Sequence, residues 1–159
     1  MWRTRRRLTD AYYENATAVP SQVAARAVFE RVRRRHPDCD LSGLLSLPPA
    51  QWQVSRHEVL EEADVLRQRL RALADAGALH LATPLRDEPA AAWFDRGLAR
   101  LAELHGPALV VEASAALVAT RDPRLLYYYR NRLAGFGLAA GAQRERPARG
   151  EADAGGFLD

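Results

Sequence analysis

The strongest constraint on the fold is a helical pattern in residues 55–77. Its apolar residues recur every three or four positions and form one stripe, whereas charged residues fill the remaining positions. The stripe consists of Val59, Leu60, Ala63, Leu66, Leu70 and Leu73. This spacing predicts an amphipathic helix of roughly 20 residues that packs one face on a core. Ser55 and Glu58 have the spacing of a capping box at its start, and Gly77 is typical of its end.

Further helices are predicted on both sides of this segment. Residues 21–35 repeat apolar side chains at helical spacing, with Ser21 as the expected cap. A short helix or turn is expected at residues 41–47, and another helix after Asp122. A fourth long pattern spans residues 90–105. Its side chains expected to face inward are Trp93, Phe94, Leu98, Leu101 and Leu104.

Residues 78–82 and 108–111 are predicted to be two short strands, with a loop at residues 83–89. Helix, short helix, long helix, strand, loop and strand follow the order of a winged helix. In this interpretation, residues 55–82 supply its last helix and first wing strand. The predicted fold is therefore mainly α, of the α+β type, with a small winged-helix-like two-stranded β element.

The expected outward face of the long helix argues against DNA binding. Its first half carries acidic residues, and the arginines come late. The acidic residues are Glu58, Glu61, Glu62 and Asp64. Carboxylates repel the phosphate backbone, so a winged-helix-like scaffold without DNA function is favoured. A nucleic-acid-binding or transcription-regulatory module remains the alternative.

The 159 residues correspond to one domain. We expect a basic segment at residues 1–17, a helical domain at residues 18–138, and a disordered tail at residues 139–159 that is rich in Gly, Ala, Arg and Glu. The longest apolar stretch, residues 107–120, is too short to cross a membrane. A cytoplasmic location is therefore expected, with the basic segment as a candidate contact to an anionic membrane surface.

No motif for catalysis, metal binding or cofactor binding is found. The sequence has neither a Gly-x-Ser-x-Gly elbow nor a glycine-rich phosphate loop, and Cys39, its only cysteine, has no reactive context. The run from His36 to Asp40 has no second ligand pair, so it is interpreted as a helix end and a polar turn. We therefore expect no catalytic residue, no metal and no cofactor.

The most unusual cluster is a run of aromatic, basic and amide side chains near the end of the domain. It consists of Tyr127, Tyr128, Tyr129, Arg130, Asn131 and Arg132. Successive helical residues point about 100° apart, so the three tyrosines cannot all be core residues. The arginines are candidates to bind a phosphate or carboxylate, and the whole cluster is a candidate ligand site or domain interface. An ordinary amphipathic helix with aromatic packing is the alternative, which composition favours.

The segment Leu-Tyr-Tyr-Tyr-Arg-Asn-Arg-Leu, residues 126–133, resembles the Tyr-Tyr-Arg-Asn segment that follows the catalytic domain of glycerol-3-phosphate acyltransferases of the bacterial membrane-associated type. Residues 18–25 resemble the stretch that opens the same region of that family. The resemblance covers roughly residues 15–138 and implies a role in phospholipid synthesis, with the acyltransferase catalytic domain as the partner.

The catalytic His-x4-Asp motif of that family is absent from this sequence. The fifth residues after the four histidines are Leu41, Glu62, Leu85 and Val110. The general base and the aspartate that orients it are therefore missing, as is the family's arginine motif for glycerol phosphate. The resemblance thus implies a non-catalytic C-terminal accessory domain, either a fragment or split part of an acyltransferase or a free-standing relative. The isolated chain is predicted to be inactive.

Overall fold

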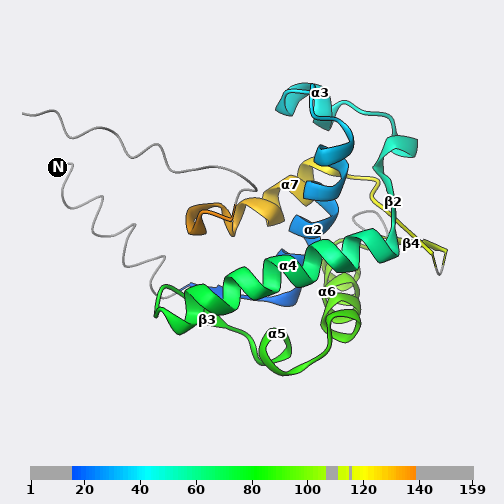
Figure 1. The fold of residues 1–159 in the computed structure, drawn as a ribbon. Coiled ribbons are helices and arrows are strands. Elements are labelled where there is room, and N and C mark those ends of the chain that lie inside the picture. The colour runs from blue at the N-terminus through cyan, green and yellow to red at the C-terminus, as the bar shows by residue number, and fades with distance from the viewer. Residues whose placement is uncertain (1–15, 107–110, 115, 139–159) are drawn as a thin grey trace, which may run out of the picture.

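The computed structural model describes residues 16–106, 111–114 and 116–138 (Figure 1). The predicted tail and all but the last two residues of the predicted basic segment lie outside the described residues. Residues 108–110 of one predicted strand also lie outside them. The prediction of a mainly α domain with a small β element is confirmed.

Helix α2 (Pro20–Arg35) is the centre of the domain and is buried on most of its surface. It contacts α4 (Arg56–Asp75), α6 (Ala90–His105) and α7 (Pro123–Asn131) (Figure 1). The helix begins at Pro20, whose fixed φ suits a first helical position. The prediction of Ser21 as the cap is therefore wrong. Ser21 lies inside the first turn and is buried, and Val19 is the cap residue.

Helix α4 confirms the predicted amphipathic helix. Its buried apolar residues are Val59, Ala63, Leu66 and Leu70. Ser55 is the cap residue, but its side chain makes no capping hydrogen bond. The predicted capping box is not formed, and Glu58 pairs with arginines of α2. Glu62 was predicted to face outward and is in fact buried, since it forms an ion pair with Arg34 of α2.

The segments around α4 differ in detail from the prediction. Helix α3 (Leu41–Leu45) is present as expected, followed by a 3-10 turn (Pro49–Trp52) that buries Trp52 completely. Helix α5 (Thr83–Asp87) replaces the predicted loop, with Leu85 buried.

The long pattern in residues 90–105 forms α6, and four of its five predicted inward residues are buried. The prediction that Leu104 faces inward is wrong, because its side chain is 50% exposed. His105, four residues after the buried Leu101, takes the inward position and contacts Tyr129.

The winged-helix element lies elsewhere in the chain than predicted. Strands β4 (Val111–Ser114) and β5 (Leu117–Ala119) form an antiparallel hairpin, and β5 also pairs with β2 (Gln53–Ser55). The predicted strand at residues 78–82 is the short β3 (His80–Leu81), which pairs in parallel with β1 (Thr17–Ala18). It is therefore not a wing strand.

The sheet order β2-β5-β4, with α6 directly before the hairpin, is the arrangement of a winged helix. The helix in the recognition position is therefore α6. The sequence had predicted α4 in that position, and that prediction is wrong. Figure 1 shows β2 and β4 together at the N-terminal end of α4.

Candidate functional site

Helix α7 carries the aromatic and basic cluster, and some of its side chains face the core while others face the surface. The Asp122 carboxylate accepts a hydrogen bond from the Leu125 amide (2.9 Å) and caps the helix, and Leu126 is fully buried against the core. Tyr127 and Tyr129 are half-buried, whereas Tyr128 is 55% exposed. This division follows the 100° spacing of a helix.

Arg130 points inward and joins α7 to α2. Its Nε and Nη2 donate to one carboxylate oxygen of the buried Glu30, at 3.1 and 2.9 Å. Its guanidinium also lies 5.4 Å from the ring centre of Phe29 and 5.7 Å from that of Tyr127. This combination of a charged hydrogen bond and cation–π contacts makes Arg130 an internal clamp.

A second arginine shares the same carboxylate. Arg26, which is 1% exposed, lies 3.7 Å from Glu30. Burial lowers the pKa of Arg26 to about 10; Glu30 opposes this shift and Arg130 adds to it. Arg26 is thus still charged at neutral pH, and the Nε and Nη1 atoms have no hydrogen-bond partner among the described residues. The guanidinium groups of Arg26 and Arg130 thus both pair with the single carboxylate of Glu30.

The other members of the cluster are divided between an internal contact and the surface. The Tyr129 hydroxyl and His105 Nε2 are 2.6 Å apart, which joins α7 to the end of α6. Asn131 and Arg132 are exposed, and the Arg132 guanidinium lies 6.0 Å from the Tyr128 ring centre. The structure therefore packs Tyr127, Tyr129 and Arg130 against the core, half-buried, and leaves the other three members exposed.

Ion pairs between α2 and α4 form a part of this region that the sequence did not reveal. Glu58 binds both Arg31 and Arg35, and Glu62 binds Arg34 at 2.8 Å. The hydrogen bond from Arg31 holds the pKa of Glu58 below its ordinary value of 4.5. These partners lie 23 to 28 residues apart in sequence, so no local pattern could have paired them.

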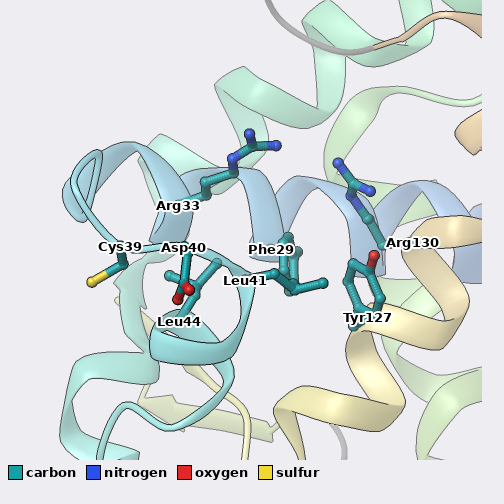
Figure 2. A pocket seen from close by; sticks show the side chains of 8 residues that line it. All are labelled: Phe29, Arg33, Cys39, Asp40, Leu41, Leu44, Tyr127 and Arg130. Atoms are coloured by element: carbon teal, nitrogen blue, oxygen red, sulfur yellow. The ribbon is translucent and has the colours of Figure 1, made fainter.

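A pocket of about 190 Å³ opens beside the clamp (Figure 2). It lies between the C-terminal half of α2, the segment that leads into α3, and α7. Its lining combines apolar, aromatic and charged side chains: Phe29, Arg33, Cys39, Asp40, Leu41, Leu44, Tyr127 and Arg130. Two members of the predicted cluster, Tyr127 and Arg130, thus line a pocket, whereas Arg33 and Asp40 were not expected as site residues.

The outer face of α6 is the surface that a winged helix presents to its partner. Its exposed residues are Ala91, Ala92, Asp95, Arg96, Ala99, Arg100, Glu103 and Leu104. The charges on this face are already paired within the domain: Arg96 with Glu88 at 2.7 Å, Arg100 with Glu103 at 2.8 Å, and Asp95 with Arg56.

No protein-family model, curated protein or solved structure matches this chain. Within the described ranges, no group of three or more His, Cys, Asp or Glu side chains is placed to hold a metal ion. Over the same residues, no helix has the length and apolar character needed to cross a membrane.

Proposed function

We propose that this chain is a non-catalytic accessory domain, the C-terminal domain of a glycerol-3-phosphate 1-O-acyltransferase, and that it docks on the catalytic domain. The resemblance in residues 18–25 and 126–133 supports this proposal. These segments are far apart in sequence, yet the helices that contain them, α2 and α7, pack against each other. These residues therefore have a structural role in joining α2 to α7, and this role does not require them to contact a substrate.

The observation that carries the docking role is the outer face of α6. Of its eight exposed residues, three are alanines and one is Leu104. The positive charges of its two arginines are balanced by the negative charges of Asp95 and Glu103. Alanine side chains add little bulk to this face, and an exposed leucine contributes apolar area on contact. A face with no net charge gives little attraction to a polyanion.

The alternative, a winged-helix module that binds nucleic acid, is less well supported. Its recognition helix would have to release Arg96 and Arg100 from carboxylates before either could contact phosphate. A phosphate-binding helix normally presents unpaired basic groups along one side.

The proposal is tested by association with an acyltransferase catalytic domain from the same genome that carries the His-x4-Asp motif. We expect a complex of one chain with one catalytic domain by calorimetry and gel filtration, and no turnover of glycerol 3-phosphate and acyl-CoA by this chain alone. Absence of a complex, together with duplex-DNA binding that weakens steeply with salt, would favour the regulatory alternative.

We propose with this function a cytoplasmic location at the inner face of the membrane. The complex with the catalytic domain would then be peripheral, and the arginine-rich sequence of residues 1–7 is the candidate contact to an anionic lipid surface. Vesicle co-sedimentation with and without anionic lipid measures this contact.

A further inference from the structure

The outer face of α7 is a basic and aromatic surface whose composition differs from that of α6. Its exposed residues on the helix are Arg124, Tyr128 and Asn131, and the exposed Arg121 and Arg132 flank the helix at its two ends. These five residues are called the outer face of α7 below. None of them is acidic, and none is aliphatic.

The three arginines of this face lack acidic partners among the described residues. Their guanidinium groups make no ion pair or hydrogen bond with that part of the chain. The helix sequence contains no Asp or Glu, and the carboxylate of Asp122 before it is used as the helix cap. On α6, by contrast, Arg96 and Arg100 both pair with carboxylates. The outer face of α7 therefore presents three uncompensated positive charges, which attract a polyanion.

Arg124, Tyr128 and Arg132 form one row along α7. They are spaced four residues apart, so each is displaced from the next by about 6 Å along the helix axis and by only about 40° around it. The Tyr128 ring is edge-on to that of Tyr129, with 5.4 Å between the ring centres, and the Arg132 guanidinium lies 6.0 Å from its centre. The side chain is still 55% exposed after both contacts. A flat ligand group therefore has ring surface to stack on, between two cations.

Asn131 adds a hydrogen-bond donor beside this row. Its side-chain oxygen accepts a hydrogen bond from Arg130 at 3.0 Å, so the clamp that joins α7 to α2 also orients the amide. The NH2 group of the amide makes no hydrogen bond with the described residues and is available to a ligand. An amide in this position suits the polar edge of a base.

We propose that the outer face of α7 binds single-stranded nucleic acid, with its arginines on phosphates and Tyr128 stacked on a base. A protein partner would normally find an apolar centre, and α7 exposes no aliphatic side chain. A duplex keeps its bases stacked inside, whereas a single strand offers both phosphates and free base faces. This inference does not rest on the docking function proposed for α6.

The test is fluorescence anisotropy of the full chain with labelled oligothymidine of about twelve nucleotides, measured over a salt series. We expect a Kd of about 10 µM at low salt, with the three arginines contributing about −2 to the slope of log K against log salt. Tyr128→Ala should weaken binding at least fivefold. Arg124→Gln combined with Arg132→Gln should reduce the slope by about 1.4.

The matched control is Arg96→Gln combined with Arg100→Gln on α6, which changes the net charge equally and should leave affinity and slope unchanged. Because all the substituted side chains are exposed, the melting temperature should not change in any of these variants. Residues 1–7 contain four arginines that also attract an oligonucleotide, so a further variant replaces these four with Gln. In that background the effect of Tyr128→Ala should persist.

Several results would overturn the proposal. They are loss of all binding when the arginines of residues 1–7 are replaced, unchanged affinity in Tyr128→Ala, and equally tight binding of a duplex of the same length. An acidic peptide of the same charge that binds as tightly, and is weakened equally by Tyr128→Ala, would show that the partner is a protein. Binding to anionic vesicles without binding to the oligonucleotide would assign the face to lipid. No catalytic domain is present in these titrations, so their outcome is separate from the docking test.

Discussion

Helices α6 and α7 both pack on α2, and both carry arginines and aromatic residues, but they use them in opposite ways. On α7, Arg130 turns inward to a buried carboxylate and stacks on two rings. On α6, the aromatic residues Trp93 and Phe94 are buried, and the outer face is left with alanines and charges that are already paired. The most unusual residues of the sequence therefore stabilise the domain, and the outer face of α6 is the surface that we propose for docking.

The comparison predicts the largest stability loss at the α7 clamp. Arg130→Met leaves Glu30 buried with only the more distant Arg26, and it also removes two cation–π contacts. Breaking a buried ion pair in this way is expected to cost about 3 kcal/mol of the free energy of unfolding. The matched Arg100→Met on α6 should change it by less than about 0.5 kcal/mol, because its ion pair is exposed. Equal losses in urea unfolding would contradict the contrast.

The inner and outer faces of α6 provide the next contrast. A Cβ atom at Gly97 would lie 2.7 Å from the backbone oxygen of Pro20 and 3.1 Å from the Cβ of Ala24. Gly97→Ala should therefore push α6 away from α2 and cost about 2 kcal/mol, despite the better helix propensity of alanine. Ala99→Ser on the outer face should cost about 0.5 kcal/mol. A more stable Gly97→Ala protein by thermal unfolding would show that the two helices are less closely packed than described.

The adjacent tyrosines of α7 sharpen the comparison within a single helix. Tyr129→Phe removes the hydroxyl that contacts His105 and is expected to cost about 1 kcal/mol. Tyr128→Phe should have almost no effect, because that side chain is 55% exposed. If chemical denaturation gave the two variants the same midpoint, the Tyr129 contact would not contribute to the stability of the domain.

The smallest expected effect is the pH dependence from the pairing of α2 with α4. Because the folded-state pKa of Glu58 is lowered, its ion pairs stabilise the domain above the ordinary value of 4.5, and this contribution is lost as pH falls below that value. Glu58→Gln should remove this part of the acid sensitivity in thermal unfolding from pH 7 to pH 3. Glu103→Gln on α6 should leave the profile as in the original protein.

Periodicity was sufficient to predict α2, α4 and α6, since each of these helices buries a stripe of apolar residues. Helix α7 was expected after Asp122, and Leu126 is its one buried residue. It failed for the sheet, because β2 and β5 have only three residues each and their pairing depends on segments more than 60 residues apart. It also failed for Glu62, a charge expected outside, whose burial depends on Arg34 of another helix.

The sequence revealed Tyr127 and Arg130 as site residues but gave no sign of their surroundings. Glu30 lies 100 residues before Arg130, and Arg33 and Asp40 join the pocket only when α2 and α7 pack together. The recognition helix was misplaced for a related reason: short strands lie before and after α6, and the earlier one, at residues 80–81, pairs with β1 instead of forming a wing.

The most direct test of the docking role compares two arginine substitutions in calorimetric titrations with the acyltransferase catalytic domain. Ala99→Arg adds a bulky charge to the outer face of α6 and should weaken association at least tenfold, with the melting temperature unchanged. Tyr128→Arg, at an exposed position on α7, should bind like the original chain. Association that is unaffected by Ala99→Arg, or that is lost instead in Tyr128→Arg, would contradict the assignment of α6 as the docking face.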